Sequence, residues 1–385
     1  MESSDEATPV YIVRDYEYIT IQAFDAGAVS ESDTDGVMFS ESSVSYHTMS
    51  TIGTDEVAEY FRSVYGFTYN ADENIPLVWP ANSTSEKLTI LLHLILRICQ
   101  DGMNVPTGAD GLLRAGGVDR KGAPRVLDLM TNCAVWVNEM ASIYDTTSFL
   151  SIDTKPLIPH TPHPRIDYEV YDFYAGIAEP DASFDIVHVR QGVMATKNFN
   201  FLLREMHRVL KRGGYLLIEE LPVRAYETSD PSLLLRSAPR RAEGVELLRA
   251  AWERQGVDTM AWDDLVTRLD PGHSHWNNQP PEDTLEHQGT KPDHIGSIIR
   301  GFHSIRLRTE LVPSGAWPTD PKQKTIGTLA HSLIAQCWRW LKPMLLLMGR
   351  DEAQADAMVD GILEEFEDEN FRSYLKCHMW SARKI

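Results

Sequence analysis

The sequence predicts an α/β protein whose central sheet is mostly parallel and doubly wound. Short apolar segments alternate with amphipathic helical segments between residues 125 and 221, and several of the apolar segments end in a charged side chain. Apolar runs of this kind are typical of strands that are buried in a parallel sheet. Alternating strands and helices favour a parallel sheet with right-handed crossovers.

The core elements follow one another in a regular order. The expected strands cover residues 125–129, 148–153, 166–172, 184–190 and 215–221, and the expected helices cover residues 135–144 and 198–210. The second helix has an apolar face made of Leu202, Leu203, Met206, Val209 and Leu210. Gly213 and Gly214 are expected to end that helix, because glycine is common just after a helix.

The whole chain divides into five expected parts. These are a flexible acidic segment (1–50), a helical extension and glycine-rich linker (51–120), the core (121–223), a helical lid or substrate region (224–295), and a C-terminal part of the sheet with helices (296–385). Within the extension we expect helices at 55–75 and 84–101. The C-terminal part should contain strands at 302–313 and 371–384, with two helices between 322 and 364.

The charge of the chain disfavours two classes of partner. It has 36 Lys and Arg against 56 Asp and Glu, for a formal net charge of −20. Nucleic-acid binding depends on a basic surface, and so does adhesion to anionic lipid. We therefore expect neither nucleic acid nor membrane as a partner.

The cysteines and the apolar segments bear on the compartment. The four cysteines form no CxxC pair, and they are Cys99, Cys133, Cys337 and Cys377. Scattered cysteines of this kind are typical of reduced thiols in the cytoplasm, which we expect here, with the nucleus as the alternative. The acidic N-terminal residues do not resemble a signal peptide, and the most apolar runs are too short to span a bilayer.

Charged side chains close four of the expected strands, namely Asp128, Asp153, Asp172 and Arg190. Ligands of doubly wound sheets bind outside the carboxyl ends of the strands. An acid after the second strand can accept hydrogen bonds from ribose hydroxyls, and an acid after the third can accept one from an adenine amino group. The alternative is that each aspartate only caps the helix or turn that follows it.

Eight stretches of the chain carry a family resemblance, and they occur in the family's order. They are YFRSVYGFTYN, RVLDLMTNCAVWVNEMA, FLSIDTKPLIP, YEVYDFYAGI, SFDIVHVRQGV, LLREMHRVLKRGGYLLIEE, GFHSIRLRTELVPSGAWPTDPKQKTIG and SARK. Together they make the chain resemble class I S-adenosylmethionine-dependent methyltransferases, and more narrowly the fungal LaeA-like family of secondary metabolism. The stretches are spread over most of residues 55–385.

The resemblance implies a fold, a cofactor and a set of binding residues. The fold would be the Rossmann-like class I methyltransferase fold, with a seven-stranded, mostly parallel sheet, and residues 121–223 would be its core for S-adenosylmethionine. Asp153 would take the ribose, and Asp172 with the backbone of Phe173 would take the adenine. Residues 188–191 would border the methionine end and the substrate. The rest of the expected cofactor-binding set is Asp128, Met130, Asn132, Ala134 and Arg190.

The chain departs from the family pattern in the loop after the first strand. Met130, Asn132 and Ala134 stand where the family has three glycines. Glycine serves there because the backbone adopts φ > 0 and lies close to the ligand. A non-glycine residue in that conformation costs about 1 kcal/mol, and the Met130 side chain enters the cofactor space or turns away from it. Phe67 also stands where the family has an arginine. We therefore expect weakened binding of S-adenosylmethionine.

Three classes of function remain open at this point. The leading one is a small-molecule methyltransferase of fungal secondary metabolism that acts on an oxygen, nitrogen or carbon nucleophile. The others are a non-methylating enzyme on the same fold, such as a cyclase or isomerase, and a catalytically silent partner or regulator. The partner would be a small-molecule substrate, with a homodimer or a protein partner as further expectations.

Histidines are the candidate catalytic groups. His188 lies at the end of the fourth strand, while His273 and His275 lie in the expected lid, where a histidine can act as a general base. The alternative for the latter two is a polar loop that faces solvent. No metal site is expected, because His160 and His163 have no third or fourth ligand near them in the sequence.

Overall fold

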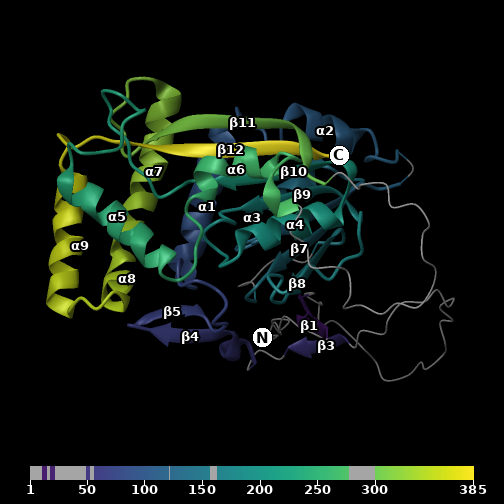
Figure 1. Cartoon of the computed structure of the whole chain (residues 1–385), viewed down its shortest axis with the longest axis horizontal. Coiled ribbons are helices and arrows are strands. Elements are labelled where there is room, and N and C mark those ends of the chain that lie inside the picture. Colours follow the sequence, from purple (N-terminus) through teal and green to yellow (C-terminus); the bar gives the residue numbers. More distant parts are fainter. Residues whose placement is uncertain are drawn as a thin grey trace, which may run out of the picture.

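The computed structural model describes residues 11–14, 18–21, 49–52, 56–120, 122–156, 163–276 and 300–385. Most of the expected acidic segment, residues 277–295 of the expected lid and residues 296–299 lie outside these ranges. The described part is built around a ten-stranded sheet with the order β11-β12-β10-β9-β6-β7-β8-β2-β1-β3 (Figure 1). Its strands are β1 (Tyr11–Arg14), β2 (Tyr18–Ile21), β3 (Met49–Ile52), β6 (Arg125–Leu129), β7 (Ser148–Asp153), β8 (Ile166–Val170), β9 (Phe184–Arg190), β10 (Leu210–Glu220), β11 (Phe302–Pro313) and β12 (Tyr374–Lys384).

The expected fold class is confirmed. Strands β8, β7, β6, β9 and β10 are parallel to their neighbours, and the antiparallel β12 lies between β10 and β11. These seven strands form the Rossmann-like sheet. Strands β1 to β3 extend its β8 edge, where β2 pairs with β8. The strand order reverses between β6 and β9, and ligands of such sheets bind at this reversal, outside the carboxyl ends of the strands.

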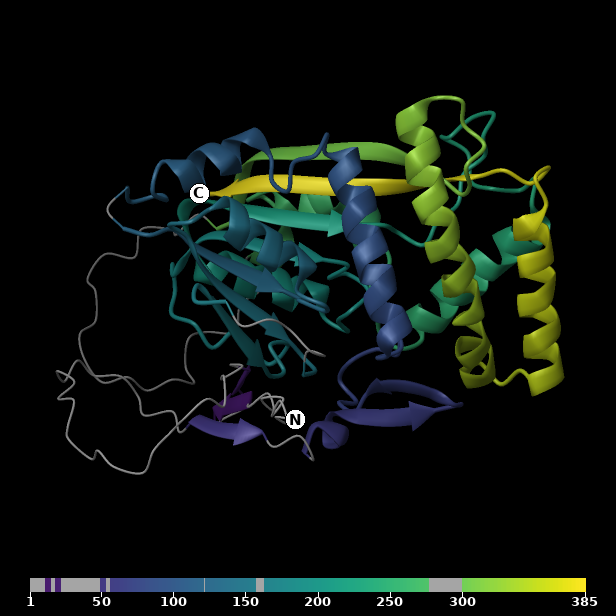
Figure 2. The same cartoon turned by 180° about the vertical axis from the view of Figure 1, so that it is seen from behind.

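Helices cover the sheet and extend beyond one end of it. The helices are α1 (Ser83–Cys99), α2 (Thr107–Arg114), α3 (Val135–Ile143), α4 (Phe199–Val209), α5 (Pro239–Glu253), α6 (Ala261–Leu269), α7 (Pro321–Arg339), α8 (Leu341–Leu347) and α9 (Glu352–Glu367). Helices α5, α7, α8 and α9 pack on one another and gather at one end of the molecule (Figure 1). In the view from behind, α1 runs across the sheet toward these helices (Figure 2).

The N-terminal extension differs from its sequence prediction. The helix expected at 55–75 is wrong, because the chain forms a short 3-10 turn (Glu56–Tyr60) and then a hairpin of β4 (Phe61–Val64) and β5 (Phe67–Asn70). Tyr65 and Gly66 have φ angles of 49° and 80°. Positive φ at both central residues is the requirement of a two-residue hairpin turn whose twist matches that of the strands. This local turn overrides the helical spacing of the apolar residues.

Three further boundaries differ from expectation. The glycine-rich linker contains α2, and the region 321–367 contains three helices in place of two. Helix α4 ends at Val209, so Gly213 and Gly214 lie inside strand β10, at an irregularity in its pairing with β9. Gly213 has a φ of 79°, so these glycines bend a strand where they were expected to end a helix.

Candidate functional site

The loop between β6 and α3 keeps the backbone of a glycine loop without its glycines. Met130, Asn132 and Ala134 have φ angles of 62°, 51° and 57°. All three therefore occupy the left-handed region that glycine adopts at little cost, which costs other residues about 1 kcal/mol each. Strain of this kind persists where the surrounding structure holds it, often at a functional site.

Hydrogen bonds from the end of β7 hold this loop. The backbone N–H of Asn132 donates to Oδ2 of Asp153 over 2.7 Å, and the Asn132 side chain donates to the Met130 carbonyl over 2.8 Å. Lys155 donates to Oδ1 of both Asn132 and Asp153 over 3.3 Å. The N–H of Thr154 is a further donor to Asp153, whose side chain is 0% exposed. The carboxylate expected at the ribose is thus surrounded by donors from the protein itself.

The acid expected at the adenine lies in a similar arrangement. Asp172 accepts a hydrogen bond from the N–H of Tyr174, and Phe173 is fully buried in the main core. The Tyr174 hydroxyl donates to the Met130 sulfur over 3.2 Å. Met130 therefore folds toward the turn after β8, on the adenosine side of the loop.

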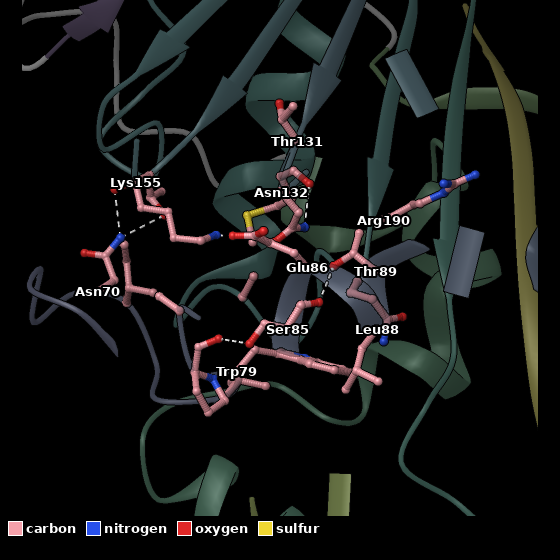
Figure 3. A pocket seen from close by; sticks show the side chains of 18 of the residues that line it. Asn70, Trp79, Ser85, Glu86, Leu88, Thr89, Thr131, Asn132, Lys155 and Arg190 are labelled. Carbon is pink, nitrogen blue, oxygen red and sulfur yellow. Dashed lines mark hydrogen bonds between the residues drawn. The ribbon is translucent and has the colours of Figure 1, made fainter. Parts of the chain in front are cut away.

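A cavity of about 120 Å³ lies beside this loop, at the strand reversal (Figure 3). Its floor is the carboxyl ends of β6 and β9 with the start of α3, and its wall is the N-terminal extension. The floor contributes Asp128, Met130, Asn132, Trp136, His188 and Arg190, and the wall contributes Tyr69, Asn70, Trp79, Ser85, Glu86 and Leu92. Four of the cofactor residues expected from the sequence do not line this cavity, namely Ala134, Asp153, Asp172 and Phe173. Thr154 and Lys155, which follow Asp153, do line it.

Several polar atoms around the cavity lack a hydrogen-bond partner among the described residues. They are Oη of Tyr69, Nε1 of Trp79, Oε1 of Glu86, Nε2 of His188 and Nη2 of Arg190. A buried polar atom without a partner costs about 1–3 kcal/mol, so such atoms are uncommon unless a ligand or water completes them. Burial raises the pKa of Glu86, and the charge of Lys155 opposes that shift. These unpartnered polar atoms belong to residues that line one cavity, which marks the cavity as a site for a polar ligand.

His188 and Asp128 face each other across the strand reversal. They are paired in register on β9 and β6, and Nδ1 of His188 lies 2.7 Å from Oδ1 of Asp128. The other Asp128 oxygen accepts from the Ser151 hydroxyl over 3.0 Å. The imidazole stacks on Trp136 with ring centres 3.6 Å apart. Because Nδ1–H donates a hydrogen bond to the carboxylate, Nε2 is the ring nitrogen that remains to act on a ligand.

Arg190 is held in a chain of buried ionic contacts. Its Nε lies 2.5 Å from Oε2 of Glu219, and its Nη1 lies 2.9 Å from Nδ1 of His93. Nε2 of His93 in turn lies 2.7 Å from Glu139. Burial and then Arg190 lower the pKa of His93 to about 4. Burial alone would raise the pKa of Glu219, but Arg190 and His188 bring it down to about 2. The ion pair with Glu219 therefore holds the Arg190 side chain in place, and its Nη2 is available to donate to a ligand.

The structure separates the three candidate histidines. His188 lines the cavity, while His273 and His275 do not line either of the two cavities described in this article. His275 packs on Trp276, and Trp276 contacts His207 near the C-terminal end of α4. Burial lowers the pKa of His275 to about 4. The geometry gives no support to a catalytic role for these two residues, because they pack among aromatic rings away from the strand reversal.

The sequence did not indicate the wall of the cavity. Asn82 caps α1 by accepting from the N–H of Ser85, and this fixes the first turn that carries Glu86. Asn70 donates to the carbonyl of Thr154 over 2.7 Å and so fastens the hairpin to the end of β7. The cap was visible as an asparagine before an apolar helix, but its position over the sheet depends on tertiary contacts.

The described part of the chain offers neither a metal-binding cluster nor a membrane-spanning helix. Within the described ranges, no group of three or more His, Cys, Asp or Glu side chains could hold a metal ion. His160 lies outside those ranges. The helices that the structure describes include none with the length and hydropathy needed to cross a membrane.

Residues 153–218 match the family model of a methyltransferase domain, and the parallel core with a cavity at its strand reversal agrees with such a domain. S-adenosylmethionine is the cofactor that such a domain indicates. The chain is also similar to two regulators of secondary metabolism. It is 22% identical over 269 residues to the secondary metabolism regulator laeA of Coprinopsis cinerea, covering 68% of this chain and 59% of that protein. It is 23% identical to the secondary metabolism regulator LAE1 of Cochliobolus heterostrophus, covering 68% and 76%.

Among solved structures, a phosphoethanolamine N-methyltransferase 2 of Haemonchus contortus resembles the chain with a TM-score of 0.37 and 14% identity. The similarity covers 77% of this chain and 57% of that one.

Proposed function

We propose that the protein is a small-molecule methyltransferase of fungal secondary metabolism, which methylates an oxygen, nitrogen or carbon nucleophile with S-adenosylmethionine. The observation that carries this proposal is the cavity at the strand reversal, where buried polar atoms of Tyr69, Glu86, His188 and Arg190 have no partner among the described residues. The methyltransferase domain match and the fungal regulators of secondary metabolism among the relatives support it.

The unpartnered atoms suit the amino-acid end of the cofactor. Glu86 offers a carboxylate oxygen to its ammonium group, and Arg190 and Tyr69 offer donors to its carboxylate. The adenosine end would rest near Thr154 and Lys155. For Asp153 to accept the ribose, Lys155 has to move, since it is the one side-chain donor that the structure places on that carboxylate.

S-adenosylmethionine supplies a methyl group on a sulfonium, and the electron pair of the breaking C–S bond stays on sulfur when the nucleophile forms its bond to carbon. Methyl transfer of this kind depends largely on positioning. His188 is the group suited to accept the proton of an O–H or N–H nucleophile. His188 lines the cavity, and Asp128 fixes its Nδ1–H. Its Nε2 has no hydrogen-bond partner among the described residues, since Glu219 lies 3.6 Å away.

A second candidate function is a catalytically silent partner or regulator, or an enzyme that uses the cavity for its substrate alone. The observation that favours it is the closed adenosine side of the loop, where Asp153 is 0% exposed and Met130 contacts Tyr174. The printed names of the two fungal relatives describe regulators, which agrees with this alternative.

Calorimetric titration with S-adenosylmethionine and S-adenosylhomocysteine separates the two. We expect both to bind to the full chain, and we expect Arg190→Met to lose at least tenfold in affinity, since hydrogen bonds to charged groups contribute about 1.5–3 kcal/mol. Arg212→Met, at a residue of β10 outside the cavity lining, is the control and should bind like the unmodified protein. Absence of binding by the unmodified protein would favour the silent or non-methylating alternative.

A further inference from the structure

A second cavity of about 80 Å³ lies between the sheet and the helices at the end of the molecule. Its lining is mostly apolar and comes from the segment after β10 and from α5, α7 and α9. The apolar lining side chains include Leu221, Val223, Leu235, Val245, Leu248, Leu333, Ile334, Trp338 and Phe366. A concave space with such a lining is suited to a small apolar ligand.

The two cavities share one wall. Trp79, Leu92, Gln191 and Met194 line both of them. Gln191 has a φ of 54°, which is a strained backbone for this residue type, and its side chain accepts from the N–H of Leu221 over 2.6 Å. Strain held by a specific hydrogen bond is common at functional positions. A molecule in the second cavity therefore ends next to the polar cavity, at Gln191.

The charges around the second cavity are balanced. Arg224 is paired with Asp263 through both guanidinium nitrogens, and Arg241 lies 3.7 Å from Glu365, whose carboxylate also accepts the backbone N–H of Arg241. Burial raises the pKa of the Cys337 thiol to about 12, so it is neutral. An additional buried charge would lack a counter-ion here, which is costly.

The unpartnered polar atoms that line this cavity are donors. Among the described residues, Nε1 of Trp79 and of Trp338 have no acceptor, and neither has Nε of Arg224 or of Arg241. The charges of these two guanidinium groups are matched by Asp263 and Glu365, so the indoles are the uncharged donors. Indole N–H groups donate and cannot accept. The cavity is therefore suited to a carbonyl, ether or hydroxyl oxygen on an otherwise apolar molecule.

We infer that this second cavity binds the methyl acceptor, and that the acceptor is an uncharged, largely apolar small molecule with oxygen acceptors. The ligand's role as methyl acceptor rests on the proposed methyl transfer, but the binding of such a molecule can be tested without cofactor. Residues 224–248 of the expected lid region contribute to this cavity, whereas the described lining of the polar cavity comes from other segments.

The test compares two probes with the same naphthalene ring system, the neutral 2-naphthol and the anion 2-naphthoate, by calorimetry near pH 7 on the full chain. The neutral 2-naphthol is expected to bind at least tenfold more tightly than the anion. Equal or tighter binding of 2-naphthoate would overturn the assignment of an uncharged ligand.

A matched pair of variants tests the location. Leu235 lines the second cavity and is 5% exposed, while Leu233, two residues earlier, is 55% exposed. We expect Leu235→Trp to weaken 2-naphthol binding at least tenfold and Leu233→Trp to leave it unchanged. Val223→Trp, at a half-buried lining residue, is a second variant for the case that Leu235→Trp does not fold. Unchanged 2-naphthol binding in the folded lining variants would place the ligand elsewhere.

The same variants keep the two proposals apart. S-adenosylmethionine should bind equally to the unmodified protein and to Leu235→Trp, because Leu235 does not line the polar cavity. Binding of 2-naphthol without binding of the cofactor would retain the apolar site and reject methyl transfer. Binding of the cofactor without binding of 2-naphthol would retain the proposed cofactor site and reject the apolar site.

Discussion

The backbone N–H of Asn132 donates to Oδ2 of Asp153 over 2.7 Å, so the altered loop closes on the acid that was expected to bind the ribose. The loop has the left-handed backbone of a glycine loop, but its own amide and Lys155 occupy the carboxylate. Cofactor affinity therefore depends on the free energy needed to break these contacts of Asp153 with Asn132 and Lys155.

Lys155→Met should strengthen the binding of S-adenosylmethionine. The substitution removes the donor that contacts both Asp153 and Asn132, and it removes a positive charge beside a cationic ligand. We expect a three- to tenfold lower Kd by calorimetry, about 1 kcal/mol, with a smaller gain for S-adenosylhomocysteine, which lacks the sulfonium charge. Lys87→Met, at an exposed residue of α1, should change nothing. Weaker binding by Lys155→Met would mean that the lysine holds the cofactor.

Ala134→Gly should leave the stability unchanged or raise it by up to about 1 kcal/mol. Ala134 has a φ of 57°, so glycine relieves backbone strain of about 1 kcal/mol, which offsets the greater freedom of the unfolded chain. Ala141→Gly, inside α3, is the contrast and should lose about 1 kcal/mol, because glycine is unfavourable in a helix interior. The free energy of unfolding in urea measures both. Equal losses would show that the loop backbone is unstrained.

Asp128→Ala should destabilise the fold by about 2–4 kcal/mol. It leaves His188 and Ser151 without the acceptor that each uses in the buried sheet. Asp128→Asn keeps an acceptor oxygen, so its free energy of unfolding should fall by less. Asp145→Ala, at an exposed position after α3, controls for loss of charge and should lose under about 0.5 kcal/mol. Denaturant unfolding compares the three variants, and a small loss of stability in Asp128→Ala would argue against a structural role of the Asp128–His188 hydrogen bond.

Glu220 should make the stability fall with rising pH. Burial raises its pKa from 4.5 to about 7, although Trp262 and the backbone of Val193 donate to it. Between these two values the folded protein holds a proton that the unfolded chain has released, so stability decreases as pH rises through this window and levels off above it. The difference amounts to roughly 3 kcal/mol.

Glu220→Gln should remove this decrease, because the amide is neutral at every pH in the window. Glu243→Gln, at an exposed residue of α5, should retain it. The measurement is the free energy of unfolding at several pH values between 4.5 and 7.5. A pH profile of Glu220→Gln parallel to that of the unmodified protein would contradict the shifted pKa.

The sequence was sufficient to predict the parallel core. Strand 184–190 was placed correctly, since a continuous apolar run between turns is a local signal, and the strand-end residues Asp128 and Arg190 do line the cavity. The positive φ angles of the loop were also foreseeable, because glycines are replaced within an otherwise matching pattern.

Other features depend on contacts that no local pattern carries. The pairing of Asp128 with His188 requires β6 to lie beside β9, which only the strand order determines. Glu86 reaches the cavity because the N-terminal extension folds over the sheet, and the extension was expected to be helical where it forms a hairpin. His275 looked catalytic by residue type, but aromatic packing accounts for its position.

The cavity wall also has a consequence for the order of events during synthesis of the chain. The hairpin and α1 leave the ribosome before the core strands do. Asn70, however, donates to the carbonyl of Thr154, and the N–H of Leu77 donates to Gln255 over 2.7 Å. Contacts so distant along the chain form late and slow the search for the native state. Leu77 therefore lacks this partner until some 180 further residues have been translated, a period in which a nascent chain is open to chaperones and to misassembly.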